Sequence, residues 1–242
     1  MSISDNLALC RESIALAAER AGRRADEIAL VGATKMNDTA RVQQAIAAGL
    51  TICGENRVQE LVQKNAEGAY EGAELHFIGH LQRNKARQVV GVASLIHSVD
   101  TISLMREIDR VAAARGIVQG ILLEVNIAGE AAKSGFAPDE IPAALALAGD
   151  LGAIRVRGLM AIPPICADGE ENRPYFQAMR QLFIDNGEKK YDKVYMDFLS
   201  MGMSGDYMTA IDCGANMIRL GTAIFGARDY SKGAPTADTP CG

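Results

Sequence analysis

Hydrophobic residues along this chain fall into eight short, nearly continuous runs, separated by longer segments in which apolar positions recur with a helical period. Continuous apolar runs of this length are typical of strands that are buried on both faces, as in a parallel sheet. The runs predict strands over residues 28–34, 50–54, 75–79, 94–99, 120–127, 154–161, 194–200 and 217–225. Helices are predicted between them, beginning near Thr39, Asn56, Gln82, Thr101, Pro138, Glu170 and Gly205.

The strict alternation of strands and helices predicts a parallel sheet. Eight such units in 242 residues favour a single closed (β/α)8 TIM barrel. A doubly wound open sheet is the alternative, but the glycine fingerprint G-x-G-x-x-G is absent after the first strand. An amphipathic segment from Ser4 to Ala21, followed by Gly22, predicts one extra helix before the barrel.

No linker divides the chain, so we expect one domain over residues 1–230. Residues 231–242 are rich in Gly, Pro, Thr and Ala and are predicted to form a loose tail.

Composition narrows the possible functions. The formal net charge is −5 and no basic stripe occurs, which argues against nucleic acid as a partner. No apolar run is long enough to span a membrane, and the N-terminal residues lack the pattern of a signal peptide. The five cysteines are scattered without the spacing of zinc ligands, which indicates reduced thiols. We therefore expect a cytoplasmic protein, without nucleic-acid or membrane partners, that is a monomer or a weak dimer.

Lys35 is the first candidate for chemistry, because it directly follows the first predicted strand. In a TIM barrel the reacting groups lie at the C-terminal ends of the strands. A lysine amine that loses its proton there is a nucleophile and forms a Schiff base with an aldehyde. The alternative is a lysine that extends from the strand end into water.

Two later segments predict a phosphate site at the same end of the barrel. Ser200-Met-Gly-Met-Ser204 follows the seventh strand, and Gly221-Thr222 lies near the end of the eighth apolar run. The loops after strands seven and eight of such barrels commonly bind phosphate, and glycine allows backbone N–H groups to approach an anion. An amine nucleophile next to a phosphate site suggests a phosphorylated aldehyde, of which pyridoxal 5′-phosphate (PLP) is the common biological example.

Three further residues leave alternatives open. Arg219 is a candidate neighbour of the pyridine nitrogen of PLP, or one half of a surface ion pair. Asn56 is a candidate ligand of the cofactor, or the cap of the helix after strand two. Lys133 also follows a strand and competes with Lys35 for the aldehyde. The histidines His76, His80 and His97 are expected to be neutral and hydrogen-bonded rather than metal ligands.

Seven stretches together resemble a known family. They are TK at 34–35, GENRVQE at 54–60, HFIGHLQRNK at 76–85, KSG at 133–135, GLMAIP at 158–163, LSMGMSGD at 199–206 and RLGTAIFGAR at 219–228. In this order, over almost the whole chain, they resemble the pyridoxal phosphate homeostasis proteins, small PLP-binding proteins related to the N-terminal barrel domain of bacterial alanine racemases. One departure is Met36-Asn37-Asp38, where relatives often have a threonine and then a proline a little further on.

The resemblance implies a role for each site residue. Lys35 carries PLP as a Schiff base, while Arg219 lies near the ring nitrogen and Asn56 lies nearby. The phosphate is held by Ser200, Gly221 and Thr222. The implied function is a carrier and regulator of vitamin B6 pools without turnover, with PLP-dependent enzymes as transient recipients.

Two other functions stay open. A PLP-dependent amino-acid racemase needs a proton acceptor on each face of the substrate. In alanine racemases the second acceptor is a tyrosine from another domain, and we expect none here because the chain ends soon after the eighth strand. A phosphosugar enzyme that uses Lys35 as an aldolase-type lysine also fits the barrel alone, but a bound PLP would exclude it.

Overall fold

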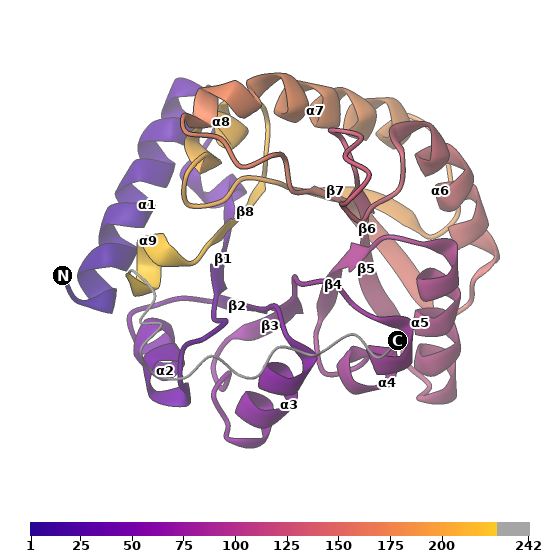
Figure 1. Cartoon of the computed structure of the whole chain (residues 1–242), viewed down its shortest axis with the longest axis horizontal. Helices are drawn as coiled ribbons and strands as arrows, with labels where there is room; N and C mark the ends of the chain where they lie inside the picture. The colour runs from indigo at the N-terminus through magenta and orange to yellow at the C-terminus, as the bar shows by residue number, and fades with distance from the viewer. Residues whose placement is uncertain (227–242) are drawn as a thin grey trace.

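Eight parallel strands form a closed barrel in the computed structural model, which describes residues 1–226 (Figure 1). Each strand pairs with its neighbours in chain order, and β8 closes the barrel against β1. The strands are β1 (Ala29–Ala33), β2 (Ile52–Glu55), β3 (Glu74–Phe77), β4 (Leu95–Val99), β5 (Gln119–Val125), β6 (Ile154–Ala161), β7 (Val194–Ser200) and β8 (Met217–Leu220). The predicted TIM barrel is confirmed and the open sheet is excluded. The predicted tail at 231–242 lies outside the described residues.

Helices surround the barrel and connect successive strands (Figure 1). They are α2 (Thr39–Ala47), α3 (Val58–Ala66), α4 (Ala86–Val89), α5 (Ile102–Ala114), α6 (Ile141–Asp150), α7 (Arg173–Gly187) and α8 (Tyr207–Asp212), with α9 (Thr222–Phe225) after β8. Short 3-10 turns cover Ala25–Glu27, Arg83–Lys85, Pro138–Glu140 and Gly169–Asn172.

The predicted extra helix is α1 (Ile3–Arg20), which packs against α2, α8 and α9 and so covers the junction of β8 and β1 (Figure 1). Its apolar face repeats with helical spacing and contains Ile3, Leu7, Cys10, Ile14, Ala17 and Ala18. The predicted helix was expected to begin at Ser4, but its N-cap is Ser2. The hydroxyl of Ser2 accepts a hydrogen bond from the N–H of Asp5, and the Asp5 carboxylate accepts one from the N–H of Ser2. Two backbone N–H groups at the start of the helix thus have acceptors.

The eighth strand is shorter than predicted. It ends at Leu220 instead of residue 225, and the residues from Thr222 to Phe225 form the single turn α9. A continuous apolar run does not distinguish a strand from a buried helical turn. Here Ile224 and Phe225 are buried, and the carbonyl of Ile224 accepts a hydrogen bond from the Asn6 side chain of α1. The packing of α1 therefore decides the conformation of this segment.

The strands carry both apolar and polar buried side chains. An apolar cluster made of Val31, Ala33, Ile78, Leu95, Leu122, Met160 and Met217 fills the centre. The buried polar side chains of His76, His97, Glu124, Ser200 and Arg219 are also on the strands. Because polar groups are costly to bury without partners, their concentration marks the region of the barrel where function is expected.

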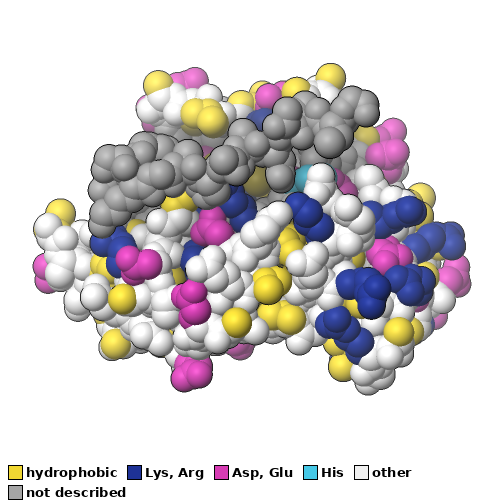
Figure 2. Space-filling model, turned by 60° about the horizontal axis from the view of Figure 1, so that its bottom comes forward, with side chains coloured by type: hydrophobic (Ala, Val, Ile, Leu, Met, Phe, Trp, Pro, Cys, Tyr) yellow, Lys and Arg dark blue, Asp and Glu magenta, His cyan; other side chains and the backbone are white. Residues whose placement is uncertain are grey.

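The outer surface carries mixed charges. Figure 2 shows acidic and basic side chains together over the visible face, with a group of lysine and arginine side chains towards one end. Cys10, Cys53, Cys166 and Cys213 are free thiols, and burial raises the pKa of Cys53 to about 12, so this thiol stays protonated. No helix of residues 1–226 is sufficiently long and apolar to cross a bilayer.

Candidate functional site

The predicted site residues lie together at the C-terminal ends of four adjacent strands, β7, β8, β1 and β2. They are Lys35 and Asn56 just after β1 and β2, Ser200 at the end of β7, Arg219 within β8, and Gly221 and Thr222 directly after β8. Strand pairing places these residues next to one another. Val31 of β1 pairs with Arg219 of β8, and Ala33 of β1 pairs with Gly54 of β2. The six residues therefore border one continuous half of the barrel mouth.

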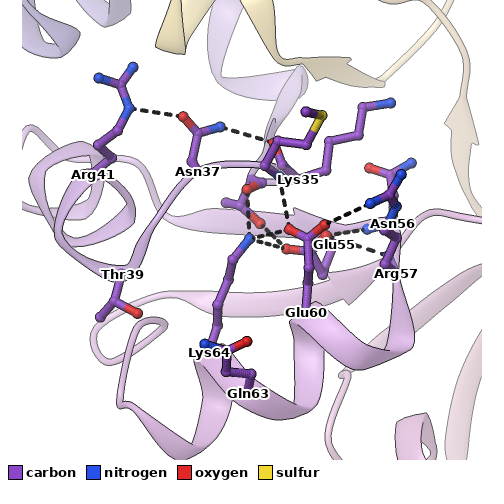
Figure 3. A network of polar contacts seen from close by, with 12 residues as sticks. Lys35, Asn37, Thr39, Arg41, Glu55, Asn56, Arg57, Glu60, Gln63 and Lys64 are labelled. Carbon is purple, nitrogen blue, oxygen red and sulfur yellow. Dashed lines mark hydrogen bonds and ion pairs between the residues drawn. The ribbon is translucent and has the colours of Figure 1, made fainter. Parts of the chain in front are cut away.

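Lys35 lies in a tight turn that begins as soon as β1 ends. The next residue, Met36, has a φ of 61°, a left-handed conformation that is uncommon for a residue with a side chain. This turn directs the side chain of Lys35 away from the buried side chains of Glu55 and Lys64 (Figure 3). Lys35 as a whole residue is partly buried.

Asn56 does not cap the helix that follows it. The cap position of α3 is Arg57, which makes no side-chain capping bond. The Oδ1 atom of Asn56 is buried and has no hydrogen-bond partner among residues 1–226, which is unusual for a buried polar atom and leaves it open to a donor. The backbone of Asn56 is also tightly packed, because a Cβ at Gly79 would lie 2.0 Å from the Asn56 carbonyl oxygen.

The loops after β7 and β8 meet at the hydroxyl of Ser204. Its Oγ accepts the N–H groups of Gly221, at 3.3 Å, and Ala223, at 3.4 Å. These two backbone N–H groups converge on one point, and an anion that took the place of the Ser204 hydroxyl would meet both donors. Gly221 lies against Ala33, since a Cβ placed on it would be 3.5 Å from the Cβ of Ala33. The donors of this loop thus lie close to the end of the strand that carries Lys35.

Arg219 is buried inside the barrel, so the surface ion pair is excluded. One of its nitrogens donates to the Oγ of Ser200 at 2.6 Å, and another donates to the carbonyl of Ala161 at 3.0 Å. Burial lowers its pKa to about 10, while Glu124 and Asp206 oppose this shift. The guanidinium therefore remains charged at neutral pH and fixed in the barrel.

A chain of hydrogen bonds leads from Arg219 across the barrel. Ser200 Oγ lies 3.1 Å from His97 Nδ1, and His97 Nε2 lies 3.0 Å from His76 Nδ1. Arginine only donates, so the Ser200 oxygen accepts from Arg219, and its own hydrogen remains available to Nδ1 of His97. In the His97 tautomer that accepts this hydrogen at Nδ1, Nε2 carries the ring proton and donates to His76. Burial lowers the pKa of His76 to about 4 and that of His97 well below its usual value, so both rings are neutral and hydrogen-bonded, as predicted.

Glu124 adds a carboxyl group to the same interior. It is buried, and it lies two residues after Leu122 of the apolar cluster on β5. Residues two apart on a strand are on the same face, so both side chains face inward. Burial raises its pKa to about 7, the negative charge of Asp100 adds to this, and Arg219 opposes it. A carboxyl group near Arg219 therefore titrates close to neutral pH.

Lys133, the competing lysine, lies in the loop after β5. Its amine forms an ion pair with Glu130 at 2.6 Å and lies 3.5 Å from the carbonyl of Ile162. It is on the opposite side of the barrel from β1 and β8 (Figure 1). The phosphate donors therefore favour Lys35 over Lys133.

A pocket of about 310 Å³ is lined in part by Ser204. Asp168, Glu170, Asp206 and Asp212 line it together with Arg20. Four carboxylates against one guanidinium repel a phosphate, so this pocket is not the anion site.

Sequence reasoning missed several residues that the structure brings to the site. Glu60 and Lys64 contact the backbone beside Lys35, and their only signal is an i, i+4 pair of opposite charge on a predicted helix. Glu124 gave no signal, because one acidic residue in an apolar run does not reveal its surroundings. Ser204 was part of the predicted phosphate segment, although its contact with Gly221 depends on the fold.

Comparison with known proteins identifies the family of this chain. The family described as alanine racemase, N-terminal domain, matches residues 6–229. Two curated relatives are both named pyridoxal phosphate homeostasis protein. The one from Aquifex aeolicus is 40% identical over 95% of this chain and 100% of its own length. The one from Escherichia coli is 39% identical over 95% of this chain and 98% of its own length.

This chain belongs to the family of pyridoxal phosphate homeostasis proteins.

Solved structures support the membership. The PipY protein of Synechococcus elongatus, solved with PLP bound, is 31% identical, with a TM-score of 0.80 over 93% of this chain and 100% of PipY. The alanine racemase of Corynebacterium glutamicum is 14% identical, with a TM-score of 0.66 over 93% of this chain and 62% of the racemase. At that identity the likeness to the racemase shows a shared fold alone.

Proposed function

We propose that this protein binds PLP as a Schiff base on Lys35 and regulates or carries vitamin B6 in the cytoplasm without catalytic turnover. The observation that carries the proposal is the convergence of four kinds of group at one end of the barrel. A lysine amine, an unpaired amide oxygen, backbone N–H donors and a buried guanidinium all border β7, β8, β1 and β2.

Each of these groups matches one part of PLP. The amine of Lys35 suits the aldehyde, and the N–H groups at Gly221 and the hydroxyl of Thr222 suit the phosphate. The hydroxyl of Ser200, which was also predicted to hold the phosphate, is fully buried between Arg219 and His97. Oδ1 of Asn56 needs a donor, which the bound cofactor or a water beside it would supply. When bound, PLP supplies an aldehyde that condenses with the lysine amine to a C=N bond with loss of one water.

Arg219 supports binding more than turnover. A guanidinium only donates hydrogen bonds, so it pairs with an unprotonated pyridine nitrogen and does not add a proton to it. An unprotonated ring withdraws electrons weakly, which disfavours reactions that place negative charge on the substrate. The relatives that this chain matches over 98–100% of their length are homeostasis proteins, which supports the same conclusion. PLP-dependent enzymes are the proposed recipients.

The first experiment combines absorption spectroscopy with borohydride reduction and peptide mapping. We expect a visible band with added PLP, and reduction should attach the cofactor to the peptide that contains Lys35. Lys35→Ala should abolish the band and the attachment, whereas Lys133→Ala should retain both. Attachment that survives in Lys35→Ala would move the site, and a protein that takes up no PLP would refute the proposal.

A second candidate function is amino-acid racemisation. Tyr207, which is half-buried at the start of α8 beside the phosphate loop, is the residue that favours it as a second proton acceptor. Exchange of the α-proton of amino acids in deuterated water distinguishes the two functions. We expect no exchange above that of free PLP, and enzyme-dependent exchange that is lost in Tyr207→Phe would establish the racemase.

The phosphate site is tested separately. Thr222→Val should weaken PLP binding about tenfold through the loss of one hydrogen bond to a charged group, while borohydride still attaches PLP to Lys35. Unchanged affinity would show that the phosphate binds elsewhere.

A further inference from the structure

Three charged side chains lie directly behind the turn that carries Lys35. They are Glu55 at the end of β2, and Glu60 and Lys64 on α3, and we call them the Glu55–Lys64 cluster (Figure 3). The side chain of Glu55 is fully buried and that of Lys64 is 8% exposed. Charges are rarely buried unless their surroundings pair and hydrogen-bond them completely, so the contacts of this cluster reveal its role.

Lys64 joins the cluster to the backbone that precedes Lys35. Its amine donates three hydrogen bonds, to the Oε2 atoms of Glu55 and Glu60, each at 2.8 Å, and to the carbonyl of Thr34 at 2.9 Å. An ammonium group has three hydrogens, so this lysine is fully satisfied by two carboxylates and one backbone carbonyl. That carbonyl belongs to the peptide bond between Thr34 and Lys35.

Glu60 holds the backbone that follows Lys35. Its Oε2 accepts the N–H of Met36 at 2.8 Å, in the peptide bond between Lys35 and Met36. Burial alone would raise the pKa of Glu60, but the hydrogen bonds from Lys64 and from the Met36 N–H outweigh burial and lower it. Both peptide bonds of Lys35 are therefore fixed by this one cluster, and Met36 keeps its left-handed φ of 61° under that restraint.

Glu55 connects the same cluster to the second loop of the site. Its Oε1 accepts the N–H of Asn56 at 2.7 Å. Its Oε2 accepts the hydroxyls of Thr34, at 3.0 Å, and Tyr70, at 3.2 Å, besides the amine of Lys64. A single buried carboxylate thus holds the loop of Asn56 and the loop of Lys35 in one fixed relation.

We propose that Lys64 and Glu60 are positioning residues that hold the backbone of Lys35 in the geometry for Schiff-base formation, with Glu55 coupling that geometry to Asn56. This inference rests on the proposed function of Lys35. Schiff-base formation joins the uncharged amine of Lys35 to the aldehyde carbon, and the carbonyl oxygen leaves as water. The amine must reach that carbon at a defined distance and angle, so a turn that is free to move reduces the population of the reactive geometry.

The structure also separates this effect from phosphate binding. The cluster contacts the loops after β1 and β2, while the phosphate donors are in the loops after β7 and β8. Loss of the cluster should therefore weaken the covalent linkage and leave the anchoring of the phosphate intact.

The test compares PLP with pyridoxine 5′-phosphate, which has an alcohol in place of the aldehyde and so makes no Schiff base. Lys64→Met removes the three hydrogen bonds and keeps the length of the side chain. We expect the dissociation constant for PLP to rise about tenfold or more and that for pyridoxine 5′-phosphate to change less than about twofold. The visible Schiff-base band should weaken at equal saturation.

Lys193→Met is the matched control. Lys193 also donates to two backbone carbonyls, those of Gly149 and Leu151, but it lies just before β7 at the opposite end of the barrel. We expect this variant to bind both compounds like the unmodified protein. Glu60→Gln is a milder second variant for the case that Lys64→Met does not fold. It should also lose affinity selectively for PLP, by a smaller factor than Lys64→Met.

Hydrogen exchange supplies a readout without any ligand. The amide of Met36 should exchange faster in Lys64→Met and Glu60→Gln than in the unmodified protein. In Lys193→Met it should exchange at the same rate as in the unmodified protein. Equal weakening of both ligands, or unchanged PLP affinity with unchanged exchange at Met36, would overturn the positioning role. A protein that binds pyridoxine 5′-phosphate and PLP equally and forms no Schiff base would instead overturn the proposed function, together with this inference.

Discussion

Removing the hydroxyl of Ser200 tests the hydrogen-bond chain inside the barrel. In Ser200→Ala the buried guanidinium of Arg219 loses one acceptor, and Nδ1 of buried His97 loses its hydrogen-bond partner. Arg219 keeps its bond to the carbonyl of Ala161, and His97 keeps its bond to His76. The substitution therefore leaves two unsatisfied polar groups in a dry interior, without removing either of them.

The expected loss of stability follows from these two groups. A hydrogen bond to a charged group contributes about 1.5–3 kcal/mol, and an unsatisfied buried polar group costs about 1–3 kcal/mol. Since the two effects share one hydroxyl, we expect a loss of about 3 kcal/mol in the free energy of unfolding. With a urea dependence of about 3 kcal/mol per molar, the midpoint should fall by about 1 M.

Urea unfolding of the cofactor-free protein, followed by far-ultraviolet circular dichroism, is the appropriate assay because the chain has no tryptophan. Ser98→Ala is the matched control, since Ser98 is buried on β4, next to His97, and its hydroxyl donates to the neutral carbonyl of Gly79. This variant should lose only about 1 kcal/mol. If Ser200→Ala loses no more than Ser98→Ala, the chain from Arg219 to His76 does not contribute to stability and the reasoning is refuted. The use of cofactor-free protein keeps this result independent of any contact between Ser200 and phosphate.

Two further predictions concern the same region of the barrel. Glu124 keeps its proton in the folded protein up to a pKa of about 7 but ionises near 4.5 when unfolded, so its contribution to stability is complete below pH 4.5 and is lost as the pH rises through 7. The stability of Glu124→Gln minus that of the unmodified protein should therefore be larger at pH 8 than at pH 4, by up to about 3 kcal/mol. Urea unfolding of the cofactor-free proteins at both pH values measures this difference. A difference that does not depend on pH would contradict the raised pKa of Glu124. Gly79→Ala places a Cβ 2.0 Å from the carbonyl oxygen of Asn56, so the loop of Asn56 must move. We expect PLP binding, measured by titration of the visible band, to weaken about tenfold or more in a folded protein, and unchanged affinity would show that this loop does not contact the cofactor.

The pattern of the sequence alone determined the architecture of this protein and the end of the barrel at which the candidate site residues lie. Continuous apolar runs require burial on both faces, and their alternation with helices leaves a closed parallel barrel as the solution. Once the strands are assigned, Lys35, Asn56, Ser200 and Arg219 necessarily lie near the same ends. These conclusions depend on local periodicity, which a single sequence contains in full.

The tertiary structure decided what each of these residues does. Arg219 is a buried cation rather than a surface ion pair, because β8 directs it towards Ser200 on the neighbouring strand. Asn56 is unpaired rather than a helix cap, because α3 begins after Arg57. The eighth strand is shortened because α1, more than 200 residues earlier, packs on the segment that follows it.

The same limit applies to Lys64, whose partners include Thr34, 30 positions away. A side chain's burial, ionisation and hydrogen bonds depend on atoms that the fold brings from distant parts of the chain. Periodicity along the sequence records which face of an element is apolar, but it does not record which polar group on another element will lie opposite. For this reason the barrel could be predicted from the sequence, whereas the cluster behind Lys35 and the histidine chain beneath Arg219 could not.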